Sequence, residues 1–322
     1  MRVTTIATLL AFSAGSAFAW GNLGHETIGF VAQSFLAPNA LSFVQTTLGS
    51  VWNFSLGPAA IWADEVKGET AFKWSANLHF VDAEDNPPTS CSVNEQRDCA
   101  NNLCILGAIA NYTTRVVDTK LDDEQIMEAL LFLDHFLGDI GQPLHVEAFE
   151  VGGNDISAKC SGESSSNLHA VWDTGMVTKH IDQSHGGTPQ QYATDLVAEI
   201  KTGSFESETA QWLACTNPTE TLSSRALVHP GAQIEADVRA LVARAGDAED
   251  ATITPLACPL AWAAESNAFD CTVVFNFTTG EDLCSGAYFN AAIPVIDLQL
   301  AKQGFRLAAW LNVLFDGSTM LP

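Results

Sequence analysis

Residues 131–149, LFLDHFLGDIGQPLHVEAF, constrain the fold of this chain more than any other stretch. His135 and Asp139 are four residues apart, so on a helix their side chains lie on the same face. Apolar residues at helical spacing, preceded by the acidic run DDE, predict a helix over 122–138. The sequence GQP ends this helix, and His145 follows the break. Two imidazoles and a carboxylate in this pattern are typical of metal ligands, although a core histidine and a capping aspartate are the alternative.

A second histidine–aspartate pair, His169 and Asp173, has the same spacing of four in the predicted helix NLHAVWDTGM. Further histidines lie beside structural breaks, and together these side chains supply enough nitrogen and oxygen ligands for two or three zinc ions. The cysteines lack zinc-finger spacing, so thiolate coordination is not expected. The candidate ligands are His25, Asp64, His79, His135, Asp139, His145, His169 and Asp173. By contrast His180, His185 and His229 have no such partner, and we predict that they lie at the surface.

The charge of the chain limits the partners it can have. Its 322 residues carry 38 acidic and 14 basic side chains, a formal net charge of −24, with no cluster of lysine and arginine. Such a chain repels phosphate polymers, so metal cations would have to attract any nucleic acid or phosphate ester. Helical patterns dominate, the best strand signal covers only 271–277, and no linker divides the chain. We therefore predict one mainly α domain with little β structure.

The first 19 residues have the features of a signal peptide. Arg2 precedes an apolar run that closes on the A-x-A sequence at 17–19, so we expect cleavage before Trp20 and secretion. The mature domain would then cover 20–322. Eight cysteines suit a secreted, disulfide-bonded protein, but the sequence does not fix their pairing. Usable glycosylation sequons begin at Asn53, Asn111 and Asn276.

Motifs along nearly the whole mature chain resemble the S1/P1 nuclease family, which is related to bacterial zinc phospholipase C. They read WGNLGHE, WADEVK, HFVDAEDNPP, DHFLGDIGQPLH, GGNDI, NLHAVWD, WAAESNAFDC and GFRLAAWLN. The resemblance implies a single compact helical domain that binds three Zn²⁺ ions per chain. It also implies two disulfides, Cys91–Cys271 and Cys99–Cys104.

The resemblance further implies how the ligands divide among the three ions. One zinc would take Asp64, His79, His135 and Asp139. A second would take the α-amine and carbonyl of Trp20, His25 and Asp139, which bridges the first two ions. The third would take His145, His169 and Asp173.

The activity implied by the resemblance is that of a secreted zinc-dependent phosphodiesterase. It would cut single-stranded DNA and RNA to 5′-phosphorylated products by means of a zinc-activated water, and would also act on 3′-nucleotides. Asp64, Lys67 and Asn154 are the expected catalytic residues, with Lys67 offsetting charge on the phosphoryl oxygens and Asn154 also contacting the phosphate. Phe80 is expected to stack on a base at the mouth of the site, and Asp82 to accept hydrogen bonds from a base edge.

Two other interpretations stay open, and the chain departs from the family pattern in places. A phospholipase C-like enzyme for lipid headgroups would need an apolar lip around the site, and a secreted glycoprotein would use its zinc structurally. Neither a membrane span nor an obligate protein partner is expected. Gly141 replaces a histidine common in the family that is not a ligand. Gly68 replaces an aromatic residue of fungal relatives, which weakens the case for a secondary nucleotide site, and the segment 223–258 is longer than in those relatives.

Overall fold

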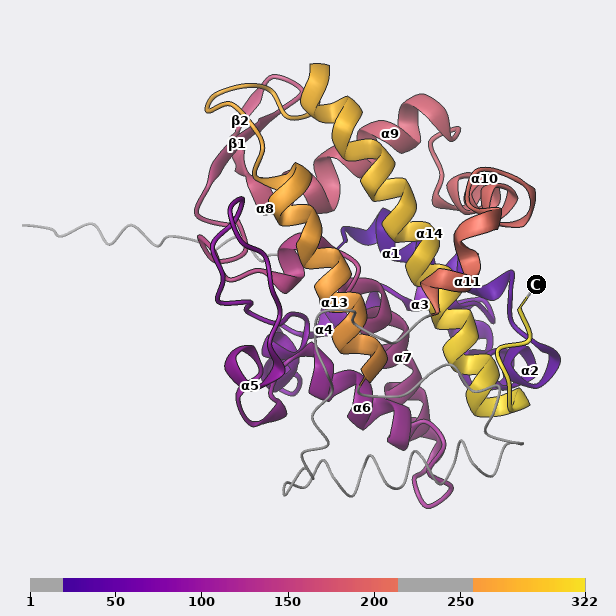
Figure 1. Ribbon diagram of the computed structural model, residues 1–322. Helices are drawn as coiled ribbons and strands as arrows, with labels where there is room; N and C mark the ends of the chain where they lie inside the picture. The colour runs from indigo at the N-terminus through magenta and orange to yellow at the C-terminus, as the bar shows by residue number, and fades with distance from the viewer. Residues whose placement is uncertain (1–19, 214–256, 322) are drawn as a thin grey trace, which may run out of the picture.

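The computed structural model describes residues 20–213 and 257–321, and this part of the chain forms a compact, mainly helical domain (Figure 1). The fold class expected from the sequence is therefore confirmed. The longer helices are α1 (Asn22–Gln33), α2 (Pro38–Leu48), α6 (Ile105–Arg115), α7 (Asp123–Asp139), α9 (Met176–Ser184), α10 (Pro189–Thr202), α13 (Ala257–Phe269) and α14 (Gly286–Asp316). Shorter ones are α3 (Leu56–Ala59), α4 (Trp62–Val66), α5 (Glu95–Asp98), α8 (Leu168–Ala170) and α11 (Thr209–Trp212).

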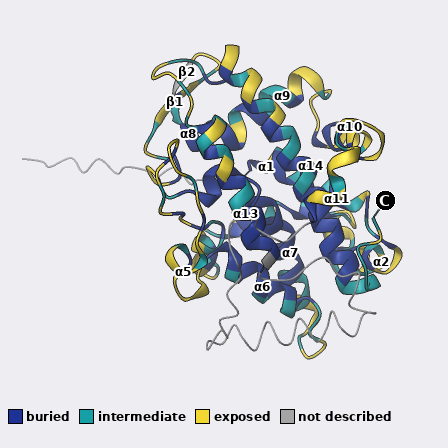
Figure 2. Ribbon diagram, in the orientation of Figure 1, coloured by how far each residue is buried: buried dark blue, intermediate teal, exposed yellow. Residues whose placement is uncertain are grey.

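The helices α7 and α14 form the centre of the core. The side chain of Asp122 caps α7 by accepting a 2.9 Å hydrogen bond from the backbone N–H of Gln125, and every residue from 129 to 139 is buried. The long α14 runs across the molecule and packs against α1, α2 and α7 (Figure 1). Dark, buried segments of these helices meet in the interior (Figure 2). The first candidate metal-ligand pair, His135 and Asp139, therefore lies in the buried core of the fold.

Helix boundaries agree with the sequence where local signals are strong. The helix predicted over 122–138 is α7. Apolar residues at helical spacing over 296–314 predict a last helix that starts at Pro294, but α14 begins at Gly286 and Pro294 lies inside it. Proline favours the first turn of a helix because it lacks an N–H, and this preference misplaced the boundary.

The described residues contain one two-stranded sheet, formed by β1 (Ser157–Cys160) and the antiparallel β2 (Glu163–Asn167). It lies in a region rich in glycine and serine. The strand predicted over 271–277 was wrong, because Asp270–Val274 forms a π-helix, η7, that continues α13. The β-branched run TVV suggested a strand. Tertiary contacts override it, since Val274 is buried and its carbonyl accepts a 2.7 Å hydrogen bond from the Tyr288 hydroxyl.

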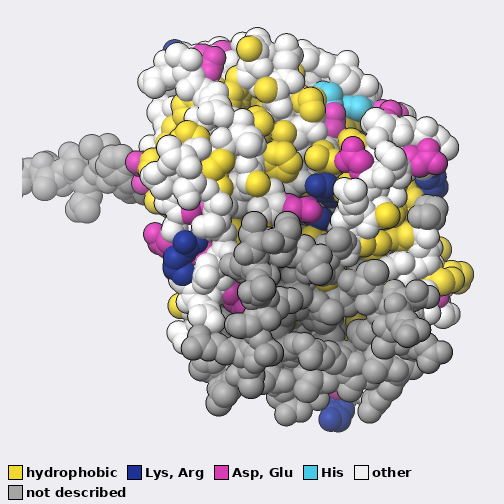
Figure 3. Space-filling model, in the orientation of Figure 1, with side chains coloured by type: hydrophobic (Ala, Val, Ile, Leu, Met, Phe, Trp, Pro, Cys, Tyr) yellow, Lys and Arg dark blue, Asp and Glu magenta, His cyan; other side chains and the backbone are white. Residues whose placement is uncertain are grey.

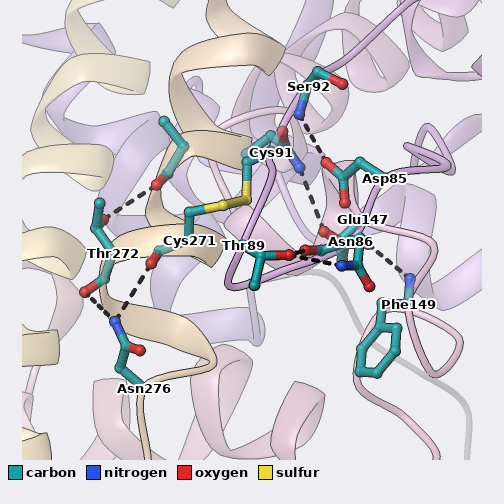
Figure 4. Close-up of a disulfide and its surroundings, with 12 residues drawn as sticks. Asp85, Asn86, Thr89, Cys91, Ser92, Glu147, Phe149, Cys271, Thr272 and Asn276 are labelled. Atoms are coloured by element: carbon teal, nitrogen blue, oxygen red, sulfur yellow. Dashed lines mark hydrogen bonds between the residues drawn. A yellow bond between two sulfur atoms is a disulfide. The ribbon is translucent and has the colours of Figure 1, made fainter.

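Disulfides tie the loop segments to this helical core. Cys91 is bonded to Cys271 at the start of η7, next to a hydrogen-bonded loop that includes Asn86 and Ser92 (Figure 4). The structure also contains the Cys99–Cys104 bond, as the family resemblance implies. A third bond joins the hairpin to the segment before α14 through Cys160 and Cys284, whereas Cys215 lies outside the described residues. None of the helices in the described ranges is long and apolar enough to cross a membrane.

Candidate metal centre

Segments from all over the fold bring the predicted ligands together in its interior. α1 and α4 supply His25 and Asp64, and the residue after the 3₁₀-helix Lys73–Leu78 is His79. The remaining ligands come from α7, from the 3₁₀-helix η4 (Pro143–Val146), from α8, and from the π-helix η5 (Val171–Gly175). Each of these eight residues is at most 5% exposed. Buried histidine and aspartate side chains gathered at one place need a cation or protons to balance them.

Asp139 is the hub of the larger group. Its Oδ1 lies 3.2 Å from His25 Nε2, while its Oδ2 lies 3.1 Å from both His79 Nδ1 and His135 Nε2. Asp64 Oδ1 faces the same two histidine nitrogens at 3.5 Å. These residues make up two overlapping groups of three donors, in each of which the donor atoms lie within 4.8 Å of one another. The two oxygens of Asp139 therefore face two adjacent sites, as a bridging carboxylate would.

A separate group is formed by His145, His169 and Asp173. His169 Nε2 lies 3.1 Å from His145 Nε2 and 3.1 Å from Asp173 Oδ2. The spacing of four residues places the His169 and Asp173 side chains on the same side of the backbone. The backbone between them passes from α8 into the π-helix η5. This group adjoins the first, because His145 Nδ1 lies 3.8 Å from Asp139 Oδ1.

Backbone carbonyls orient three of the imidazole rings. His135 Nδ1 lies 2.6 Å from the carbonyl oxygen of Ala60, and His169 Nδ1 lies 2.7 Å from that of Gly152. His145 Nδ1 is 2.9 Å from the carbonyl of His79. A carbonyl can only accept, so each Nδ1 carries a proton and each Nε2 is turned toward the cluster. Metal-binding histidines are held in this way by their outer hydrogen bonds.

Several buried atoms in the cluster have no hydrogen-bond partner among the described residues. They include Asp64 Oδ2, Asp139 Oδ1, Asp173 Oδ2 and His79 Nε2. A buried carboxylate oxygen without a partner is costly, and a metal cation would remove that cost. The donors are imidazole nitrogens and carboxylate oxygens, which are zinc ligands. The residues therefore fit zinc ions.

The pKa shifts in the cluster have their origin in burial and in opposite charges. Burial lowers the pKa of His79 to about 4 and also lowers the pKa of His25. Burial opposes the charged form of His135 as well, but Asp139 and Asp64 outweigh it and raise the His135 pKa to about 10. In return, His135 holds the pKa of Asp139 well below its usual range despite burial. Asp139 therefore stays ionised, which binding of a metal ion requires.

Two of the predicted catalytic residues lie at the edge of this cluster or near it. Lys67 Nζ is 2.6 Å from Asp64 Oδ1, and its side chain is mostly buried. A lysine held against a candidate ligand places a fixed positive charge at the site. Asn154 is half-buried; its amide N–H donates to the carbonyl of Val151 at 2.9 Å, and its oxygen accepts from Asn167 Nδ2 at 3.3 Å.

The predicted substrate-binding residues are held beside the cluster by backbone hydrogen bonds. The N–H of Val81 donates to the carbonyl of His145 at 2.9 Å, and the carbonyl of Phe80 accepts from Ile105 at 3.0 Å. Phe80 is half-buried and is not among the described side chains that pack against the hydrophobic core. Asp82 is exposed. Both side chains are therefore more exposed to solvent than those of the candidate ligands.

Trp20 is fully buried, and its neighbours connect it to two of the ligand groups. The N–H of Gly21 donates to the carbonyl of Asp173 at 2.8 Å, and the carbonyl of Gly21 accepts from the N–H of His25 at 3.3 Å. The start of the predicted mature chain therefore lies beside residues of both groups. In the unprocessed chain the Trp20 nitrogen belongs to a peptide bond and is not an amine.

Sequence reasoning missed residues whose partners lie far away in the chain. The prediction that His180 and His185 lack a partner was wrong: each ring, 14% exposed, contacts an aspartate, Asp297 and Asp195 respectively. No local pattern could have paired them with those residues. Gln142 was also missed, although it is fully buried and donates to Asp173. His229 lies outside the described residues.

A buried set of histidines and aspartates in three adjoining groups, each suited to a metal ion, is the kind of site found in metal-dependent hydrolases.

Comparison with known proteins agrees with this class. The family model for S1/P1 nuclease matches residues 20–316. The chain is 39% identical to Nuclease P1 of Penicillium citrinum over 298 residues, covering 91% of this chain and 97% of the relative. It is 36% identical to Nuclease S1 of Aspergillus oryzae, with 92% of each chain covered. Endonuclease 3 of Arabidopsis thaliana is 28% identical, over 95% of this chain and 92% of the relative.

The chain belongs to the S1/P1 nuclease family. It is accordingly an S1/P1-type endonuclease, a hydrolase of phosphodiester bonds.

Proposed function

We propose that this protein is a secreted, zinc-dependent nuclease that hydrolyses single-stranded DNA and RNA to 5′-phosphorylated products and also acts on 3′-nucleotides. The observation that carries the proposal is the position of Asp139, whose two oxygens face His25 on one side and His79 with His135 on the other. A carboxylate so placed suits two adjacent cations, and paired cations suit a phosphodiester substrate. The net charge of −24 makes such cations necessary for attracting a polyanion.

The residues that would hold three zinc ions follow the groups described above. Asp64, His79, His135 and Asp139 would bind the first, and Asp139 would bridge to a second held by His25 and the α-amine and carbonyl of Trp20. His145, His169 and Asp173 would bind the third. When bound, these ions would lower the pKa of water toward 7 and stabilise negative charge on phosphate oxygens.

The chain's own residues would orient the phosphate. Lys67 is anchored by Asp64, so its ammonium group is held in place beside the first ligand group and can offset charge on a phosphoryl oxygen. Asn154 can contribute its side-chain amide to binding of the phosphate. That amide already hydrogen-bonds to Val151 and Asn167, so the substrate would have to share it with these two residues. Both side chains bind and position the substrate without exchanging a proton.

Selection of single strands would fall to Phe80 and Asp82. A half-exposed ring beside the cluster can stack on a base, which a duplex allows only after unpairing and unstacking at a cost of a few kcal/mol. The exposed carboxylate of Asp82 can accept hydrogen bonds from a base edge. Single-stranded substrates should therefore be cut faster than duplex ones.

Processing and secretion belong to the same proposal. Cleavage after residue 19 would turn the Trp20 nitrogen into the amine that the second zinc requires. Of the three sequons, Asn53 and Asn276 are exposed, whereas Asn111 is half-buried within α6 and two residues before the buried Thr113. Glycosylation is therefore favoured at the first and third sites. Mature 20–322 would act as a single nuclease domain.

One assay separates the proposed function from its alternatives. The mature protein is incubated with single-stranded DNA, with duplex DNA, with a 3′-nucleotide and with phosphatidylcholine, before and after removal of metal by a chelator. We expect activity on the first and third substrates that is lost on chelation and restored by zinc. Hydrolysis of phosphatidylcholine alone would favour a phospholipase, and no hydrolysis of any substrate would favour a structural metal centre.

A matched pair of chains tests the amine ligand. The mature chain beginning at Trp20 is compared with one carrying a single extra residue before it. We expect the extended chain to keep its fold by circular dichroism while losing much of its activity and about one zinc ion per chain. Equal zinc content and activity in both chains would contradict this part of the proposal.

A further inference from the structure

A second set of histidines lies outside the cluster described above. His180 is on α9, His185 is the residue that ends α9, and Asp297 is on α14. Their three donor atoms lie within 4.8 Å of one another. The site is near the surface, where histidine side chains lie beside acidic ones in the region of α9 and α10 (Figure 3). These residues have no role in the proposed nuclease reaction.

The donor distances suit a small tetrahedral cation. His180 Nε2 lies 3.0 Å from His185 Nε2 and 3.1 Å from Asp297 Oδ1. Zinc bonds of about 2.0–2.1 Å in tetrahedral geometry place ligand atoms roughly 3.3 Å apart. The observed separations are therefore close to those that a shared zinc ion would impose.

The contact that His185 makes on the side away from His180 also indicates a metal ligand. Its Nδ1 lies 2.7 Å from Asp195 Oδ2, on α10. A carboxylate accepts, so Nδ1 carries the proton and the lone pair of Nε2 is turned toward His180. A carboxylate that orients a histidine in this way is the usual outer partner of a zinc ligand. The two carboxylates also bring negative charge to the site, which a divalent cation would balance.

Tyr192 fixes the remaining parts of this arrangement. It is fully buried on α10, its hydroxyl donates to Asp297 Oδ1, and the His185 ring stacks on its ring at 4.1 Å. The His180 ring meets the same tyrosine edge-on at 5.5 Å. A single rigid aromatic side chain therefore positions all three donors before any ion arrives, which favours binding.

We propose that His180, His185 and Asp297 form an additional zinc site, separate from the nuclease centre, that joins α9 to α14 and is braced by α10 through Asp195 and Tyr192. Partial exposure of the donors leaves one coordination position for water, as in a site with three protein ligands. The ion would stabilise the packing of three helices. His180 follows Asp173 by seven residues along a nearly continuous helical path, roughly 10 Å at 1.5 Å per residue. The ion would thus also hold the end of α9, the helix that follows Asp173 of the third ligand group.

The test is equilibrium dialysis of the full mature chain at a fixed free zinc concentration, with bound metal counted per chain. His185→Gln and Asp297→Asn should each bind one ion fewer than the wild type, whatever number the nuclease centre holds. Asp195→Asn keeps all three donors and should weaken this one ion 10- to 100-fold. Asp182→Asn removes an exposed carboxylate from the same helix and should match the wild type. Equal zinc content in all the variants would overturn the proposal and leave the His180–His185 contact as a hydrogen bond.

A measurement on the wild type covers the case in which a variant fails to fold. Crystals of the zinc-equilibrated protein, measured on both sides of the zinc absorption edge, should give an anomalous peak between His180 Nε2, His185 Nε2 and Asp297. No peak there, with peaks present at the nuclease centre, would overturn the proposal. Thermal unfolding supplies a third readout, since added zinc should raise the melting temperature of the wild type more than that of His185→Gln.

Discussion

Gln142 Nε2 donates a 2.5 Å hydrogen bond to Asp173 Oδ1 and so connects the break after α7 to the π-helix η5. The other end of the same side chain is also fixed, because its oxygen accepts a 2.7 Å hydrogen bond from the N–H of Leu144. With Oδ1 held by Gln142, Asp173 presents Oδ2 to His169 Nε2 at 3.1 Å. Gln142 is therefore a positioning residue for the third ligand group.

Replacing Gln142 should weaken metal binding at this group without removing a ligand. We expect Gln142→Ala to lower the zinc affinity of the His145, His169 and Asp173 group 10- to 100-fold, the usual effect of losing an outer hydrogen bond. Gln142→Glu should be worse, because it sets a second carboxylate against Asp173. Competition with a chromophoric chelator measures the affinity. The exposed Gln190 provides the control, and a Gln142→Ala protein that binds zinc as the wild type does would refute the assignment.

Gly141, which replaces the histidine common in the family, lies against the side chain of Gln303. A Cβ atom at position 141 would come within 2.3 Å of Gln303 Cγ. Gln303 is fully buried on α14, so it has no open space to move into. We expect Gly141→Ala to lower the free energy of unfolding by about 1–3 kcal/mol, as overpacking does.

A double-mutant cycle tests that explanation. Gln303→Ala removes the clashing atom, so the pair Gly141→Ala with Gln303→Ala should be more stable than the sum of the single changes predicts. Gly68→Ala is the control, because a Cβ atom there would meet nothing within 4 Å. Urea unfolding gives the four free energies. If the losses in the free energy of unfolding are additive, then contact with Gln303 is not the cause of the destabilisation by Gly141→Ala.

Asp270 should make the stability of the protein depend on pH. It is fully buried, and neither carboxylate oxygen has a hydrogen-bond partner among the described residues. Burial, with Glu147 and Asp85 nearby, raises the Asp270 pKa well above its ordinary value of 3.8. The folded state thus holds a proton that the unfolded state releases, so this contribution is complete below pH 3.8 and is lost as pH rises toward the folded pKa.

Asp270→Asn should remove that dependence. Between pH 5 and pH 8 the wild type should lose stability relative to the variant, by up to about 1.4 kcal/mol per pH unit for one proton. Unfolding by urea at several pH values, with zinc saturating throughout, gives the two slopes. Glu206→Gln, at an exposed position, should follow the wild type. Parallel curves for the wild type and Asp270→Asn would show that Asp270 does not titrate in this range.

The parts of the fold that the sequence predicts are those whose signals are local. The α7 helix carries its cap, its apolar spacing and the His135–Asp139 pair within one short stretch, and the structure has all three. The π-helix over Asp270–Val274 could not be predicted, because its β-branched residues favour a strand and packing against α14 and η4 decides otherwise. At such places tertiary contacts outweigh the local β-strand propensity of the residues.

The same division holds within the candidate site. The candidate ligands appear in the sequence as pairs or beside breaks, so their coming together at one place could be predicted. Their outer partners could not, because the carbonyl of Ala60 and the side chain of Gln142 have no residue-type signal that links them to His135 or Asp173. The pairing of His180 with Asp297 likewise depends on how α9 crosses α14, which no local pattern specifies.

Removing the Phe80 ring should alter substrate binding and leave the metal centre intact. Phe80 is half-buried beside His79, and the described core packs without it. Stacking of a base on an aromatic ring contributes roughly 1–3 kcal/mol, so Phe80→Ala should raise KM for single-stranded DNA roughly 5- to 150-fold. Zinc content and melting temperature should stay those of the wild type. The control is Phe54→Ala, which removes an exposed aromatic ring elsewhere on the chain and should leave KM unchanged. If Phe80→Ala keeps its KM, or loses zinc and unfolds, then Phe80 packs the site and the preference for single strands has another source.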